Sequence, residues 1–207
     1  TARNNRSEPS GAVTLDTQGG VWSASTMGTG VWYLPPGAWR PGGDGQFVNF
    51  TEKLGATVSG GIPIYRTRDG LIWFGTRDGI YRYDGQQVTS LPRPKEGLPA
   101  QTFNCIFEDS KNRLWFGTPG GASCFDGQLW SNLDSRDGLA GDNVTTIVED
   151  PRGDFWFGTD KGLTRYRPKK VTPNAPAIAV QTQTDRLDYN LAAAPAIATG
   201  QRVTFHF

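Results

Sequence analysis

Apolar and aromatic positions fall in short runs along this chain, and polar turn residues separate the runs. The segments 103–107 and 144–148 are rich in β-branched and aromatic side chains, which are typical of strands. The pairs Asp84-Gly85 and Asp126-Gly127 stand between such runs and predict tight hairpin turns, because these turns need positive φ. No segment keeps a sustained helical period with caps. The pattern therefore predicts an all-β chain of short antiparallel strands.

The runs belong to a repeat. The tetrapeptide Trp-Phe-Gly-Thr begins at Trp73, Trp115 and Trp156, at spacings of 42 and then 41 residues, and a degenerate copy begins at Trp22. A four-stranded unit repeated at about this length predicts the blades of a β-propeller. A two-layer sandwich, the alternative, would not place the same tetrapeptide in every second hairpin. The four strands of one period, named a to d, are expected at 144–149, 154–159 and 162–166 and, from the preceding copy, at 128–132.

Other residues keep a fixed place in the repeat. An aspartate stands six positions before the tryptophan at Asp16, Asp109 and Asp150. The carboxylate pairs 108–109 and 149–150 recur with it, which indicates turn formation rather than acid–base catalysis. The glycine of each tetrapeptide lies inside a strand pattern and predicts close approach of the backbone toward a crowded axis. We expect structural roles for the repeated residues Trp73, Gly75, Trp115, Gly117, Trp156 and Gly158.

The order Asp, turn, apolar-Trp-Phe-Gly-Thr, Gly-apolar and Tyr-Asp-Gly resembles the two-component regulator propeller repeat. The resemblance covers residues 12–167, and the copy at Trp22 departs from it. It implies the periplasmic, extracytoplasmic sensor region of a bacterial hybrid two-component receptor of the histidine kinase type. Such a module would be non-enzymatic and would bind a small molecule or a glycan. It would meet the membrane only through a downstream helix.

This interpretation divides the chain into four segments. Residues 1–11 form a polar N-terminal segment, and 12–167 form the blades. Residues 168–177 read as a proline-rich, extended linker. Residues 178–207 resemble the beginning of an Ig-like Y_Y_Y domain, which follows such propellers in the receptors.

The number of blades is a separate question. The fourth copy lacks a strand d, so we expect this chain to hold about four blades of a larger propeller, with a compact four-bladed ring as the alternative. An open set of blades exposes strand edges and favours pairing with a second copy as a homodimer.

The amino-acid composition argues against several classes of function for this chain. The net charge is +1, with 21 basic and 20 acidic residues, which gives no electrostatic footprint for nucleic acid. The only histidine is His206, so histidine-based metal sites and Ser-His-Asp triads lack parts. We therefore expect no catalytic residue, no metal and no cofactor. A propeller enzyme, either a lyase or a glycoside-cleaving enzyme, and a protein-interaction propeller are the alternatives, because fold does not fix function.

The two cysteines, Cys105 and Cys124, fall on strands a and c of one blade. With strand b between them their Cα atoms should be about 10 Å apart, which is too far for a disulfide. We expect both to be small buried hydrophobes.

Candidate ligand residues come from the loops. In a propeller the b–c and d–a loops share one face, and here they gather hydrogen-bonding groups. The alternative is that these loops form a solvated rim that binds no ligand. In the first copy an insertion between strands c and d, within residues 30–44, carries Trp39 and is expected to pack against a neighbouring domain. A recognition tip formed by Trp39 and Arg40 is the alternative. Trp130, on a strand d, is expected to pack between blades rather than stack on a sugar. The candidate ligand-binding rim is Arg77, Asp78, Gln101, Arg136, Asp142, Asn143, Asp160 and Lys161.

Overall fold

The computed structural model describes residues 10–25, 30–38, 45–54, 62–91 and 102–168, together with the backbone of 182–184 and 187–189. The chain divides into two units, Thr1–Pro168 and Lys169–Phe207. Candidate residue Gln101 and the insertion residue Trp39 lie outside the described residues. In the second unit, β16 (Thr182–Thr184) and β17 (Leu187–Tyr189) form a two-stranded antiparallel pair.

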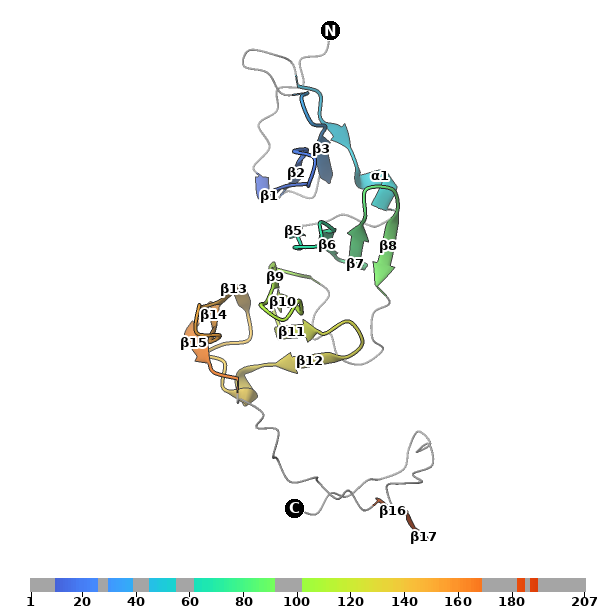
Figure 1. The fold of residues 1–207 in the computed structure, drawn as a ribbon. Helices are drawn as coiled ribbons and strands as arrows, with labels where there is room; N and C mark the ends of the chain where they lie inside the picture. The colour runs from blue at the N-terminus through green and yellow to red at the C-terminus, as the bar shows by residue number, and fades with distance from the viewer. Residues whose placement is uncertain are drawn as a thin grey trace. The chain divides into compact units, whose positions relative to one another are not determined.

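The first unit consists of four antiparallel sheets, each built from consecutive strands (Figure 1). We number them blades 1 to 4. Blade 1 contains β1 (Ser10–Leu15), β2 (Val21–Ser25), β3 (Val31–Leu34) and β4 (Val48–Asn49). Blade 2 contains β5 (Ile64–Arg66), β6 (Ile72–Thr76), β7 (Gly79–Tyr83) and β8 (Val88–Leu91). Blade 3 contains β9 (Cys105–Glu108), β10 (Leu114–Thr118), β11 (Gly121–Phe125) and β12 (Trp130–Leu133). Blade 4 contains β13 (Val144–Glu149), β14 (Phe155–Thr159) and β15 (Gly162–Tyr166).

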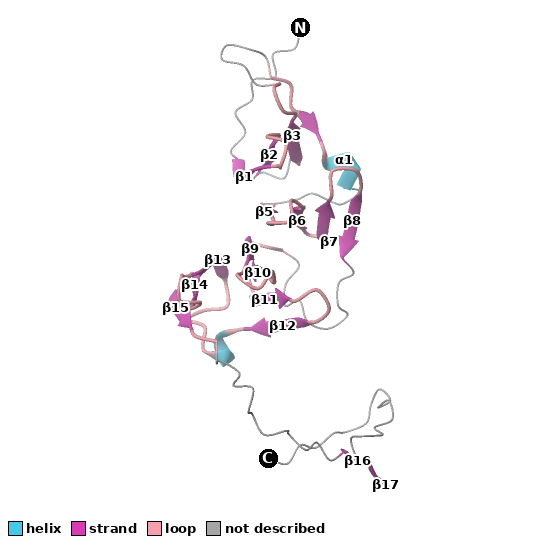
Figure 2. Ribbon diagram, in the orientation of Figure 1, coloured by secondary structure: helices cyan, strands magenta, loops and turns pink. Residues whose placement is uncertain are grey.

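The prediction of an all-β propeller of antiparallel blades is confirmed. Within the described ranges the helical segments are the single turn α1 (Thr51–Leu54) and the 3-10 turn η1 (Ser135–Asp137), as Figure 2 shows. One boundary differs from expectation, because β1 begins at Ser10, inside the segment expected to be polar. The backbone of Ser10 pairs with Ser25, and a bulge at Ala12 shifts the register before the regular pairing begins.

Two of the strand-b tryptophans contact an aromatic ring of the next blade. The ring of Trp22 lies 5.7 Å from that of Phe74, and the ring of Trp115 lies 5.6 Å from that of Phe157. Trp22, Trp73 and Trp115 are at most 5% exposed. Trp156 in blade 4 is only partly buried. The repeated aromatic pair therefore joins one blade to the next.

The glycine of the tetrapeptide leaves room for that packing. A Cβ atom on Gly117 would lie 2.5 Å from Cys105 Sγ and 2.7 Å from the backbone oxygen of Val144. A Cβ on Gly75 would lie 2.8 Å from the Cβ of Phe103. These distances are too short for a side chain. One neighbour of Gly117 is backbone, as predicted, whereas those of Gly75 are side chains.

The cysteines lie on the strands expected for them, and one of the two is buried as predicted. β9 and β11 each pair with β10, so one strand separates Cys105 from Cys124. Both are free cysteines, Cys124 buried and Cys105 partly buried. Burial raises the pKa of each thiol to about 11, so both stay neutral at neutral pH.

The spacing of six between aspartate and tryptophan has a structural cause. The indole Nε1 donates to the aspartate Oδ2 in Trp22–Asp16 (3.2 Å), Trp115–Asp109 (2.9 Å) and Trp156–Asp150 (3.3 Å). The other carboxylate oxygen accepts backbone N–H groups two and four residues further on and so closes the a–b turn. The repeated aspartate therefore fixes the turn and satisfies a buried indole at the same time.

Candidate ligand-binding site

The turns between strands b and c carry part of the predicted rim. Arg77 and Asp78 are exposed in the β6–β7 turn, and Asp160 and Lys161 are exposed in the β14–β15 turn. The threonine of the tetrapeptide holds each turn: Thr76 Oγ1 donates to the Gly79 carbonyl at 3.1 Å, and Thr159 Oγ1 donates to that of Gly162 at 2.9 Å. These b–c turns present charged side chains on a firmly bonded backbone.

The loop between blades 3 and 4 is closed by its own side chains. Asp134 caps η1 and binds the guanidinium of Arg136, with Nη2 to Oδ2 at 2.5 Å. Asp142 Oδ1 accepts from the backbone N–H of Ser135 at 2.8 Å. The hydrogen bonds from Arg136 lower the pKa of Asp134, and that from Ser135 lowers the pKa of Asp142. Two predicted rim residues, Arg136 and Asp142, thus hold the shape of the loop.

At blade 4, several of the predicted rim residues lie close to one another. Asn143 Oδ1 accepts from Asn104 Nδ2 at 2.9 Å, and the Asn143 carbonyl accepts from the backbone N–H of Asp160 at 3.3 Å. A Cβ atom on Gly141 would lie 3.0 Å from Asp160 Oδ1 and from Lys161 Cβ. The d–a loop therefore packs against the b–c turn. Arg77 and Asp78 belong to the b–c turn of blade 2 and not to this part of the rim.

A groove between blades 2 and 3 was not predicted. Its volume is about 600 Å³, and its lining includes Thr67, Trp73, Arg82, Glu108 and Phe125. Trp73 is 5% exposed, and its Nε1 has no hydrogen-bond acceptor in the described part of the chain. The sequence did carry a signal for this groove: position 67, six residues before the tryptophan, is a threonine where the other copies have aspartate.

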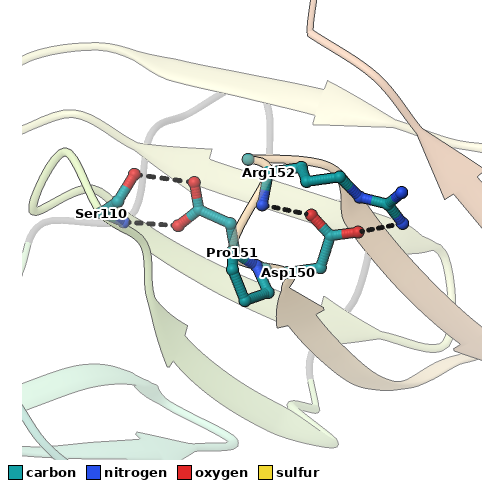
Figure 3. Close-up of a pocket in the computed structure, with 6 residues that line it drawn as sticks. Ser110, Asp150, Pro151 and Arg152 are labelled. Atoms are coloured by element: carbon teal, nitrogen blue, oxygen red, sulfur yellow. Dashed lines mark hydrogen bonds and ion pairs between the residues drawn. The ribbon is translucent and has the colours of Figure 1, made fainter.

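A second hollow, of about 500 Å³, lies where the a–b turns of blades 3 and 4 meet (Figure 3). Glu149 binds the backbone N–H and the hydroxyl of Ser110, and Asp150 binds the backbone N–H of Arg152 at 2.8 Å. The carboxylates of this hollow are thus engaged in turn and interblade bonds. The aspartate of the pair forms the turn, as its recurrence predicted, whereas the glutamate bonds the neighbouring blade.

The ring contacts of Trp130 lie within its own blade, at 5.5 Å from the ring of Phe116 and 4.8 Å from that of Phe125. It also packs against the apolar cluster to which blades 2 and 3 contribute, and its packing between blades stays a prediction. Among the described residues, no group of three or more His, Cys, Asp or Glu side chains could hold a metal ion. No helix in the same ranges is long and apolar enough to cross a membrane.

Two segments of the chain, residues 97–120 and 138–161, match the two-component regulator propeller family. The matched segments contain the tetrapeptides of blades 3 and 4. No curated protein matches the sequence.

Solved structures extend the likeness to most of the chain. The extracellular domain assigned to a hybrid two-component system of B. thetaiotaomicron is 25% identical, with a TM-score of 0.63 over 90% of this chain and 25% of that one. One assigned to a one-component system of the same organism is 17% identical, with a TM-score of 0.61 over 89% and 24%. Virginiamycin B lyase from Staphylococcus aureus is 19% identical, with a TM-score of 0.55 over 83% and 59%. The chain thus spans about a quarter of the two extracellular domains.

These similarities do not support the same conclusions about the chain. The first extracellular domain and the family match agree on a sensor-type propeller, and an extracytoplasmic domain is consistent with both. The lyase likeness shows the fold alone. Nothing in the comparisons concerns the Y_Y_Y domain, which stays a prediction for residues 178–207.

Proposed function

We propose that this chain is the ligand-sensing propeller of an extracytoplasmic receptor of the bacterial hybrid two-component type, and that it is not itself an enzyme. The observation that carries the proposal is the family match at residues 97–120 and 138–161 together with the likeness to an extracellular sensor domain over 90% of the chain. The periplasm is the compartment that this role requires. The ligand is a small molecule or a glycan.

The proposed contact surface is the part of the rim on blade 4. Asp160 and Lys161 are exposed and stand beside the d–a loop, whose backbone is fixed by Arg136 and Asp142. A rigid loop with exposed charges suits selective binding, because little ordering entropy is lost when a ligand arrives. Sensing further requires that the ligand bind two states of the receptor unequally.

The proposal is tested in the intact receptor with a transcriptional readout, using neutral and acidic oligosaccharides as inducers. The double charge reversal Asp160→Lys with Lys161→Glu should reduce the response to the active inducer. The matched control is Lys111→Glu, an exposed charge reversal in the a–b turn of blade 3, on the opposite face. An unchanged response in the rim variant would remove this surface from the proposal, and turnover of an oligosaccharide by the purified chain would replace the sensor with an enzyme.

Further blades are part of the same proposal. Val13 and Leu15 on β1 are 61% and 53% exposed, and Leu163 on β15 is 63% exposed. Apolar side chains in these places are suited to packing against another blade, as Trp22 and Trp115 are packed. We propose that additional blades of the same receptor cover them. A longer chain should be monomeric and more stable in urea than this one, whereas a stable dimer of this chain at micromolar concentration would favour a second copy as the cover.

A further inference from the structure

Blade 3 shows how the repeat holds a carboxylate. Asp109 Oδ2 accepts from the indole Nε1 of Trp115 at 2.9 Å and from the guanidinium Nε of Arg113 at 2.7 Å. The side chain of Asp109 is fully buried. An indole N–H and a guanidinium thus form a built-in carboxylate site within blade 3.

Blade 4 holds a second carboxylate on the same sheet face. Arg165 is the register partner of Trp156, and its guanidinium lies 5.6 Å from the Trp156 ring. That guanidinium binds Asp154, which stands two residues before Trp156. Arg167 Nε adds a bond to Asp154 at 2.9 Å.

Blade 2 keeps the equivalent donors and lacks both carboxylates. Arg82 is the register partner of Trp73, as Arg165 is of Trp156. The sequence has Thr67 in the place of Asp109, however, and Leu71 in the place of Asp154. Two groups that bind carboxylates elsewhere in the repeat are therefore left without that partner.

The donors are unpaired in the described part of the molecule. Trp73 is 5% exposed, and its Nε1 has no acceptor there. The Thr67 hydroxyl, which replaces the carboxylate, is bonded to Asp69 Oδ1 at 2.5 Å. Arg82 is exposed, and the ion pairs of the described residues do not include it. A buried donor without an acceptor is unfavourable, so the site favours a ligand that supplies one.

The groove that contains these donors can hold a small molecule. Its volume is about 600 Å³, and Leu71, Leu91, Leu114 and Phe125 give it apolar walls. The two carboxylates in its lining are already engaged. Asp69 accepts from Thr67 and from the backbone N–H of Leu71, and Glu108 accepts from the backbone N–H of Arg68 at 2.8 Å. Of the two cations in the lining, Arg68 lies 3.9 Å from Glu108, and Arg82 is the one without an ion pair among the described residues.

We propose that this groove between blades 2 and 3 binds a small organic carboxylate. The carboxylate accepts from Trp73 Nε1, as Asp109 accepts from Trp115, and it pairs with Arg82, as Asp154 pairs with Arg165. Its aromatic ring or sugar ring lies against Leu91 and Phe125. The groove is separate from the rim of the proposed sensor site, and its binding is measurable whether or not the chain signals.

The test uses the 207-residue chain labelled with ¹⁵N-tryptophan, whose indole N–H resonances are recorded by NMR. Benzoate and D-glucuronate are the probes, and benzamide and D-glucose are their uncharged counterparts. Each is added to about 10 mM, because fragment-sized ligands bind weakly. We expect the Trp73 indole resonance, assigned from Trp73→Phe, to move with a carboxylate and not with its counterpart. The Trp115 indole, already bound to Asp109, should not move.

Variants separate this site from general anion binding. Thr67→Asp supplies an internal carboxylate, so it should abolish the titration of Trp73 and raise the thermal midpoint. Arg82→Gln should weaken binding about tenfold, as expected for the loss of a charge-assisted bond. Arg66→Gln is the matched control, since Arg66 is exposed on the same blade and does not line the groove. The proposal is wrong if neither carboxylate moves the Trp73 resonance, if benzamide moves it equally, or if Thr67→Asp and Arg82→Gln titrate like the unmodified chain.

Discussion

The carboxylate of Glu149 accepts two hydrogen bonds from Ser110 in the preceding blade, one from the backbone N–H at 2.6 Å and one from the hydroxyl at 2.7 Å. The same relationship occurs one blade earlier, where Glu108 accepts from the backbone N–H of Arg68 at 2.8 Å. In both cases the glutamate precedes the turn aspartate and reaches the a–b turn of the neighbour. The Glu-Asp pair therefore has a divided role: the aspartate closes its own turn, and the glutamate joins two blades.

The first prediction concerns this interblade bond. Glu149→Gln should lower the free energy of unfolding by about 1 kcal/mol, because the two charge-assisted bonds to Ser110 become bonds between neutral groups, at a partly exposed site. Urea denaturation followed by circular dichroism measures the change. The control is Glu52→Gln, an exposed carboxylate on α1. Equal stability of the two variants would show that the bond to Ser110 has no net effect.

The second prediction concerns the turn aspartate. Burial alone would raise the pKa of Asp109, but the bonds from Trp115, Arg113 and Lys111 outweigh it and lower the pKa. Asp109→Ala removes the acceptor of all three, so the free energy of unfolding should fall by about 3 kcal/mol. The comparison is Asp126→Ala, which removes an aspartate from an exposed c–d turn where its partners are backbone N–H groups. A loss as small as that of Asp126→Ala would contradict the role given to the indole bond.

The third prediction concerns the glycine of the tetrapeptide. Gly117→Ala should cost about 3 kcal/mol, because its Cβ would meet the Val144 backbone oxygen at 2.7 Å, and backbone cannot turn aside as a side chain can. Gly158→Ala should cost less. Its Cβ meets the Thr146 methyl group at 2.6 Å, and that group belongs to a side chain in blade 4 that can rotate. Thermal unfolding of the two variants gives the order, and a larger loss for Gly158→Ala would overturn this reading.

The regular part of the fold could be predicted closely from the repeat. Strands a and c of blade 4, expected at 144–149 and 162–166, occur at those residues. Strand d of blade 3 begins at Trp130 rather than at 128, because the Asp126 side chain accepts the backbone N–H groups of Gln128 and Leu129 and keeps both in the turn. Hydrophobic periodicity predicts well where strands lie. It does not predict how many further residues a turn side chain keeps in the turn through its hydrogen bonds.

The candidate sites were harder to predict, for a different reason. Arg136 and Asp142 read as available charges in the sequence, yet Arg136 is bonded to Asp134 and Asp142 to Ser135. Short-range bonds of this kind depend on loop geometry that a sequence pattern does not contain. In the sequence, the only sign of the groove at Trp73 is that Thr67 stands where the other copies have aspartate. The consequence of this difference becomes clear only from the indole–aspartate bonds of the other blades.

The last prediction concerns pH. Asp154 binds both Arg167 and Arg165, and the hydrogen bonds from these guanidinium groups lower the pKa of Asp154 far below its usual range. A carboxyl whose pKa is lowered in the folded state stabilises that state above its unfolded pKa of about 3.9, and the contribution is lost as the pH falls below that value. Asp154→Asn should therefore be less stable than the unmodified chain at neutral pH, and the difference should shrink in acid. Because Arg165 and Arg167 are 40% and 68% exposed, added salt should also reduce it. Urea midpoints measured from neutral pH to below about pH 3.9 provide the check, and a difference that stays constant over this range would show that the ionised carboxylate is not what stabilises blade 4.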